Sequence, residues 1–109
     1  MSRIPEPPPD FIWPQGWFPC PDGWERTGSV EDELQRELCK THPLYHRSCR
    51  VVGRHSAHPD EYLFAVDLGD GPLAFVHLTW ELESDPNWPY TVMYASYEEF
   101  RDAWEIRSP

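Results

Sequence analysis

Two cysteines and two histidines fall within eleven residues near the middle of the chain, as Cys39, His42, His46 and Cys49. Two thiolates and two imidazoles are a ligand set that holds Zn²⁺ in tetrahedral geometry. Structural zinc sites more often use two ligand pairs separated by about a dozen residues or more, so the spacing here is compressed. In the alternative interpretation, His42 before Pro43 ends a helix and both cysteines are small buried apolar groups. A zinc-binding module is therefore the second of two functional hypotheses, and the sequence indicates no other cofactor.

His77 lies inside a predicted strand, where a histidine can serve as a general base. Asp67 would raise the pKa of His77 if the two side chains fell opposite each other on neighbouring strands. A triad also requires a nucleophile, which this pattern lacks, and the P-loop, HExxH and G-x-S-x-G motifs are absent. His55 and His58 are expected to be solvated loop histidines, with a metal or pH-sensitive cluster as the alternative. We therefore predict no catalytic residues and a protein that is not an enzyme.

Carboxylates alternate as Glu81, Glu83 and Asp85 in a loop that follows the strand of His77. The formal net charge of −10 argues against nucleic acid and anionic membrane as partners, but it permits a protein with a basic surface. An acidic patch would steer such a partner into contact, whereas the simpler alternative is a solvated acidic edge. We expect these three carboxylates to belong to a partner-binding surface.

Residues 1–28 are rich in proline and tryptophan and precede a single predicted domain at 29–109. The prolines impose extended or turn geometry on this segment. We expect the segment to lie across the domain and cover an edge or a face, with a docking peptide as the alternative. Trp13 and Trp17 are expected to be exposed. Because exposed tryptophan is a favoured interface anchor, both join the predicted partner-binding residues.

Two helices are expected to bracket the domain. The first starts at Ser29, which stands at N-cap spacing from Asp32, and His42-Pro43 ends it. The second starts at Ser96, whose spacing from Glu99 is that of a capping box.

The segments between the helices are expected to be strands. In 61–68, Tyr62, Phe64, Val66 and Leu68 share one face, and 73–80 has the pattern of a buried strand. These strands cover 48–55, 61–68 and 73–80, and 90–95 is either a short fourth strand or an extended crossing. The order predicts an α+β fold with a small antiparallel sheet of three to four strands. An N-terminal and a C-terminal helix pack on one face of it, and the Pro/Trp-rich extended segment precedes it. One aromatic core cluster is expected, formed by Trp80, Trp88, Trp104, Tyr97 and Phe100.

A longer pattern runs through these elements. Residues 76–80 read Val-His-Leu-Thr-Trp, Trp88-Pro89 follows, Ser96-x-x-x-Phe100 closes the pattern, and His42-Pro43-Leu44 lies upstream. Over about residues 30–104 the chain resembles a group of small bacterial proteins that share a V-H-L-T-W … W-P … S-x-x-x-F pattern. That group has no established activity. The resemblance therefore implies domain limits and a bacterial origin rather than a function.

The composition indicates where such a protein resides. Three cysteines show no disulfide-framework spacing, residues 1–20 lack a signal-peptide core, and no run of about 18 apolar residues exists. We expect a reducing, cytoplasmic location. The first functional hypothesis is a non-enzymatic, acidic bacterial protein-binding domain, either an immunity or inhibitor-type protein or a subunit of a larger complex. The oligomeric state is not determined by the sequence.

Overall fold

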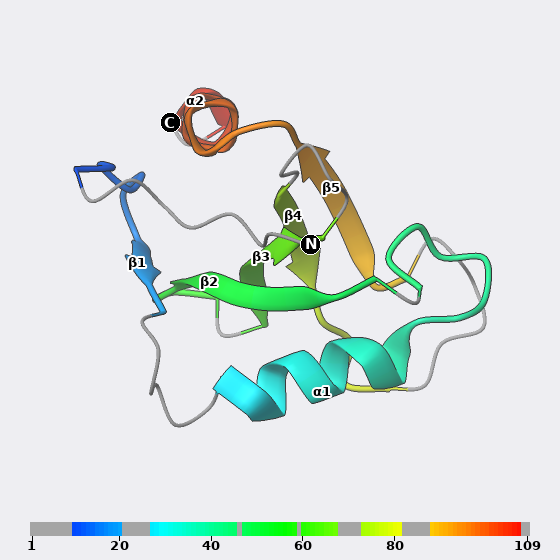
Figure 1. The fold of residues 1–109 in the computed structure, drawn as a ribbon. Coiled ribbons are helices and arrows are strands. Elements are labelled where there is room, and N and C mark those ends of the chain that lie inside the picture. Colours follow the sequence, from blue (N-terminus) through cyan, green and yellow to red (C-terminus); the bar gives the residue numbers. More distant parts are fainter. Residues whose placement is uncertain are drawn as a thin grey trace.

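The computed structural model describes residues 10–20, 27–45, 47–58, 60–67, 73–81 and 88–107. Within these residues the elements are β1 (Trp17–Pro19), α1 (Thr27–Glu37), β2 (Cys49–His55), β3 (Glu61–Val66), β4 (Leu73–His77), β5 (Tyr90–Tyr94) and α2 (Tyr97–Arg107). The strands form one antiparallel sheet in the order β1-β2-β3-β4-β5, so neighbours in the sheet are also neighbours along the chain (Figure 1). The α+β class is confirmed.

The two helices lie on opposite faces of the sheet, as Figure 1 shows with α1 below and α2 above. The expectation that both helices pack on one face is therefore wrong. The reason is visible in β3, whose residues from Tyr62 to Val66 are all buried. A strand that is apolar on both faces requires cover on both faces.

The predicted strand number was also too low, because β1 adds a fifth strand at the edge beside β2. Three residues that end in Pro19 carry no alternation from which a strand could be recognised. The first helix begins at Thr27 rather than Ser29, follows β1, and ends at Glu37. The chain from Leu38 to Tyr45 continues instead in successive turns, with bonds such as His42 N–H to the Cys39 carbonyl at 3.0 Å.

Each face of the sheet has its own core. The α1 side is largely aliphatic, and its buried residues are Val30, Leu34, Leu38, Leu44, Val51, Tyr62, Phe64, Val66, Ala74, Val76 and Leu78. The α2 side is rich in rings, and its buried residues are Trp17, Val52, Leu63, Ala65, Leu73, Phe75, Tyr94, Tyr97 and Phe100. Tyr97, Phe100 and Trp104 thus belong to a core cluster, as expected. Trp80 and Trp88 do not, since they are 45% and 46% exposed.

The described part of the N-terminal segment covers the sheet edge, as the first interpretation of this segment predicted. Trp17 is only 3% exposed and lies opposite His55 in the β1–β2 pair, so its expected exposure is wrong. Trp13 is half-buried and lies over Gly53, where an added Cβ would come within 2.6 Å of the Trp13 ring. Only a residue without a side chain leaves room there. Residues 1–9 and 21–26 lie outside the described residues.

None of the helices in the described residues has the length and apolar character needed to cross a membrane.

Candidate functional site

The predicted zinc ligands do not come together in the part of the chain that the structure describes. His42 accepts the Leu44 N–H at its Nδ1 (3.0 Å), and its Nε2 lies 3.2 Å from the Pro89 carbonyl, to which it donates. Both ring nitrogens are therefore occupied, and burial lowers the His42 pKa, which favours this neutral ring. His42 thus joins the turn after α1 to the start of β5.

The two cysteines of the predicted set differ in their surroundings. Burial raises the pKa of Cys49 to about 12, whereas a hydrogen bond with the Thr41 hydroxyl lowers the pKa of Cys39. His46 lies outside the described residues. Among the residues that are described, no group of three or more His, Cys, Asp or Glu side chains is arranged to hold a metal ion. No observation therefore favours the zinc hypothesis over the binding hypothesis.

The histidine on β4 has a different partner from the expected one. His77 lies opposite Glu61 of β3, and its Nδ1 is 3.5 Å from the Glu61 carboxylate. Asp67 follows the far end of β3, so Asp67 and His77 do not fall opposite each other on neighbouring strands. Cys49 pairs with Val66 at that same far end, away from His77.

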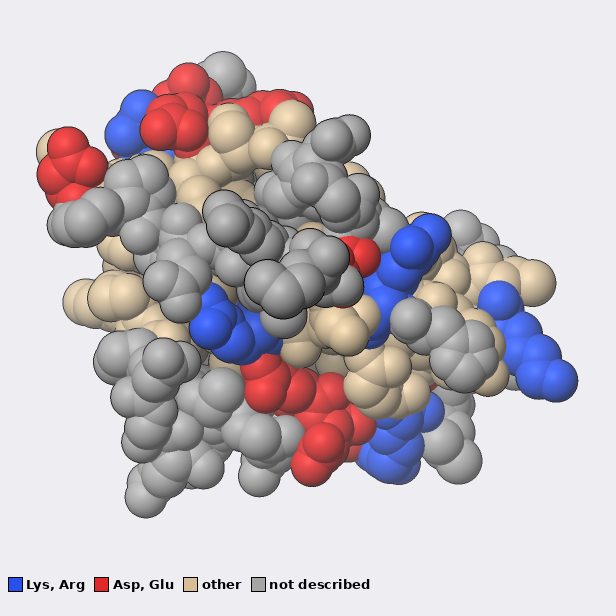
Figure 2. All heavy atoms as spheres, in the orientation of Figure 1, with Lys and Arg blue, Asp and Glu red and all other residues tan. Residues whose placement is uncertain are grey.

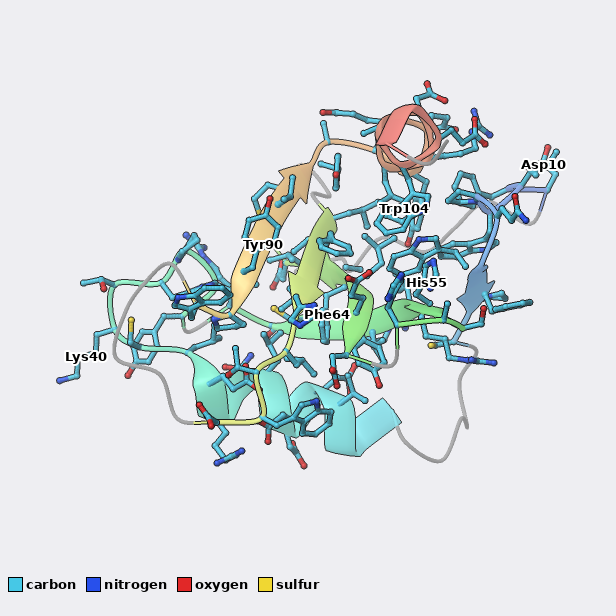
Figure 3. All side chains as sticks on the ribbon, turned by 180° about the vertical axis from the view of Figure 1, so that it is seen from behind. Asp10, Lys40, His55, Phe64, Tyr90 and Trp104 are labelled. Atoms are coloured by element: carbon cyan, nitrogen blue, oxygen red, sulfur yellow. The ribbon has the colours of Figure 1, made fainter. Side chains whose placement is uncertain are left out.

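His55 and His58 lie together, with ring centroids 4.6 Å apart. His55 also packs against the ring of Trp104 from α2 at 5.3 Å, and Figure 3 shows these two side chains facing each other. The Ala57 N–H donates to His55 Nδ1 at 3.0 Å. Burial, and then the neighbouring His58, lower the His55 pKa. His55 therefore packs between β2 and α2 as a neutral ring rather than as a solvated loop residue.

The most unusual backbone in the described residues lies just after β4. Trp80 has a φ of 60°, which bulky residues seldom adopt and which costs about 1–3 kcal/mol. Its side chain is nevertheless 45% exposed, so packing of the indole ring does not account for the conformation. Other groups must hold this backbone in place.

Glu37 of α1 holds the backbone of this segment. It is fully buried, one carboxylate oxygen accepts the Thr79 N–H (2.8 Å) and hydroxyl (3.1 Å), and the other accepts the Trp80 N–H (2.7 Å). These bonds explain why β4 stops at His77 although apolar alternation continues beyond it. A side chain from the first helix thus fixes the residues that follow the fourth strand.

A second carboxylate shares this buried position. Glu33, one turn earlier on α1, makes a paired ion contact with Arg36 at 2.8 Å and a hydrogen bond with Glu37. Burial, and then the hydrogen bond that Glu37 donates to Glu33, raise the pKa of Glu37 to about 7, and the bond with Arg36 lowers the pKa of Glu33. Near neutral pH the pair therefore shares a proton, with Glu37 as the donor to Glu33.

The indole ring of Trp80 is fixed separately. Its Nε1 donates to a carboxylate oxygen of Asp60 at 2.7 Å, and the Asp60 carbonyl accepts the Leu78 N–H at 2.8 Å. Backbone and ring are thus held independently. We call the set Glu37, Asp60, Thr79, Trp80 and Glu81 the Trp80 platform.

The charge at the surface of the platform is negative. Asp60 is half-buried beside the indole, and Glu81 is exposed next to it in sequence. In the view of Figure 2, carboxylates also gather over α1 and α2. Of the predicted partner-binding carboxylates, Glu81 lies on the platform, while Glu83 and Asp85 lie outside the described residues.

The motif residues behind the sequence resemblance have structural partners here. Thr79 and Trp80 are bound by Glu37 and Asp60, as described above. Ser96 accepts the Glu99 N–H at 3.0 Å, which confirms the predicted capping interaction at the start of α2.

Comparisons of this chain with protein-family models, with curated proteins and with solved structures found no match.

Proposed function

We propose that this protein is a non-enzymatic binding domain that docks a basic partner protein at the Trp80 platform. One observation carries the proposal: a large apolar ring is held on the surface by a strained backbone and by specific hydrogen bonds. Strained conformations persist only where surrounding groups impose them, and they cluster at functional sites. Here the surrounding groups are Glu37 and Asp60.

The platform has the properties of an interface anchor. Tryptophan is among the residues that contribute most to binding when a partner covers them. Because the ring and backbone of Trp80 are already fixed, docking would cost little conformational entropy. Asp60 and Glu81, within a chain of net charge −10, would attract a basic surface and repel an acidic one.

The class of partner is inferred by analogy from the small size and acidic charge of the protein. By that analogy, a small, acidic, motif-poor domain is an inhibitor or immunity partner of a basic toxin or nuclease, or a subunit of a larger complex. Three free cysteines support a reducing, cytoplasmic setting. Because Thr79 and Trp80 belong to the pattern shared with small bacterial proteins, the proposal extends to that group.

Native mass spectrometry of the protein purified from the cells that produce it tests the proposal. Wild-type protein is expected to carry a stoichiometric second protein that high salt releases, because charged contacts are screened. Trp80→Ala is expected to lose this partner. Trp88→Ala is the matched control, since Trp88 is equally exposed. A partner retained by Trp80→Ala, or no partner on the wild-type chain, would overturn the proposal.

A further inference from the structure

The second feature that suggests an interaction is the edge of the sheet at β5. This strand pairs with β4 in an unbroken register from Leu73–Tyr94 to His77–Tyr90, and it is the last strand in the sheet order. Natural proteins guard such edges with charges, prolines or bulges. The sequence of β5, Tyr-Thr-Val-Met-Tyr, contains none of these. Tyr90 and Met93 are 44% and 37% exposed along it.

The opposite edge of the sheet, at β1, is protected against pairing with another strand. β1 is three residues long and ends at Pro19, so it offers few hydrogen-bonding groups to a neighbour. The helix that follows β5 lies over one face of the strand, where Phe100 packs 5.6 Å from the Tyr94 ring, and not along its hydrogen-bonding edge. α2 runs back across the sheet, and its Trp104 packs against Trp17 of β1 at a centroid distance of 5.2 Å. Figure 3 shows Tyr90 on β5 well apart from Trp104.

We propose that β5 pairs antiparallel with β5 of a second copy of this chain, around a two-fold axis at Val92. A two-fold interface requires a surface that is complementary to itself. In an antiparallel pair centred on Val92, Tyr90 lies opposite the partner subunit's Tyr94, so an exposed ring at each end of the pair meets a second aromatic ring. Thr91 then lies opposite the partner subunit's Met93, and the two five-stranded sheets become continuous.

Side-chain packing favours this pairing. Val92 lies opposite Phe75 and packs on the aromatic core beneath α2, and Tyr90 lies 6.4 Å from the Phe75 ring. Alternation along the strand places Tyr90, Val92 and Tyr94 on this same face. The two tyrosine pairs would therefore extend the aromatic core across the axis, and aromatic cross-strand pairs stabilise sheets. Exposed Met93, on the other face, would be covered by the partner.

The net charge of −10 opposes dimerisation but does not forbid it. No charged residue lies in β5. Glu98 and Glu99 follow Tyr94 in α2, so the antiparallel arrangement places these acids at opposite ends of the strand pair. Five residues of strand span about 17 Å, roughly two screening lengths at physiological salt. Added salt should therefore strengthen the dimer, whereas it should weaken docking of a basic partner.

Sedimentation velocity of the full-length chain over a range of concentrations tests the dimer. Wild type is expected to show a dimer that salt strengthens. Met93→Lys places a charge on the edge and should weaken association by at least roughly tenfold. Ile12→Lys adds the same charge at a residue that is 72% exposed outside β5, and it should leave the dimer intact. A monomer at all concentrations and salts would overturn the proposal.

The position of the axis is tested by cross-linking with diamide in a Cys39→Ser background. Val92→Cys places two thiols opposite each other, within the Cα separation that a disulfide spans. This variant should give a covalent dimer, and Thr91→Cys, which faces the partner subunit's Met93, should not. A dimer that withstands Met93→Lys and does not cross-link at Val92 would show that another surface is used.

Discussion

Trp17 and Trp80 differ in both their exposure to solvent and their hydrogen bonding. Trp17 is 3% exposed and packs edge-on against the rings of Phe100 at 5.0 Å and Trp104 at 5.2 Å. Its buried indole Nε1 has no hydrogen-bond partner among the described residues. Trp80 is 45% exposed, yet its indole and its backbone N–H are both bound by carboxylates.

From this difference we infer that Trp17 stabilises the fold, whereas Trp80 serves to bind a partner. At Trp17 the gain from apolar burial outweighs an unsatisfied polar group, so the residue serves the fold. At Trp80 hydrogen bonds to Glu37 and Asp60 hold the residue while 45% of it stays exposed, so burial contributes less to the fold here than at Trp17. A ring held in this way is available to a partner. The two regions should therefore respond differently to the same substitution.

The largest expected effect is on the buried side. Trp17→Ala should lower the free energy of unfolding by about 3–5 kcal/mol, because it removes a large ring from the aromatic core and leaves a cavity. Trp80→Ala should change it by less than about 1 kcal/mol, as expected for an exposed side chain. Urea denaturation of both variants checks the contrast. Equal losses would mean that the two regions do not differ as described.

A smaller effect is expected at the carboxylate beneath the platform. Glu37→Ala leaves the N–H groups of Thr79 and Trp80 without an acceptor and should cost about 2 kcal/mol. Glu37→Gln keeps one acceptor oxygen and should cost less. Denaturation of both variants provides the measurement. If Glu37→Ala is as stable as wild type, Glu37 does not hold the segment after β4.

The proton that Glu37 shares with Glu33 should make the stability of the folded protein depend on pH. The folded pKa of about 7 lies above the ordinary value of 4.5, so the folded state binds more protons between these values. Stability from this group should therefore fall as pH rises from about 5 to 8, by at most about 1.4 kcal/mol per pH unit. The lowered pKa values of His42 and His55 give the opposite slope.

Comparison with Glu37→Gln isolates the effect, since the two histidines titrate in both proteins. Denaturation midpoints at pH 5 and pH 8 should show that wild type loses stability relative to the variant as pH rises. Parallel pH profiles would rule out the shared proton.

The smallest expected effect concerns the rate of association. Replacing Glu81, Glu83 and Asp85 together by glutamine should slow docking of the basic partner several-fold and weaken its salt dependence. Stopped-flow measurements at low and high salt provide the rates. Unchanged kinetics would mean that these carboxylates do not steer the partner.

The sequence located the elements better than it located the platform. A composition rich in apolar, β-branched and aromatic residues marked the segments of β2, β3, β4 and β5, because the central strands are buried on both faces. It did not mark β1, whose burial depends on contacts with the distant α2. Trp17 was expected to be exposed in the Pro/Trp-rich segment and Trp80 to be buried in an aromatic core cluster, and the structure reverses both expectations.

The platform has no local signature in the sequence. Trp80 is held by a carboxylate 43 residues earlier in the chain and by another 20 residues earlier. Glu37 looks like any surface residue of an amphipathic helix, and only the packing of α1 against the sheet buries it. The one available sign was the strand alternation that ends at a tryptophan followed by acids.

The affinity of the captured partner for wild type, Trp80→Ala and Trp88→Ala tests the Trp80 platform most directly, with the melting temperature recorded for each protein. Trp80→Ala should lose at least about 2 kcal/mol of binding free energy, roughly thirtyfold in affinity, with its melting temperature nearly unchanged. Trp88→Ala should bind as wild type does. Wild-type affinity in Trp80→Ala, or an equal loss in both variants, would contradict the assignment of the anchor to Trp80.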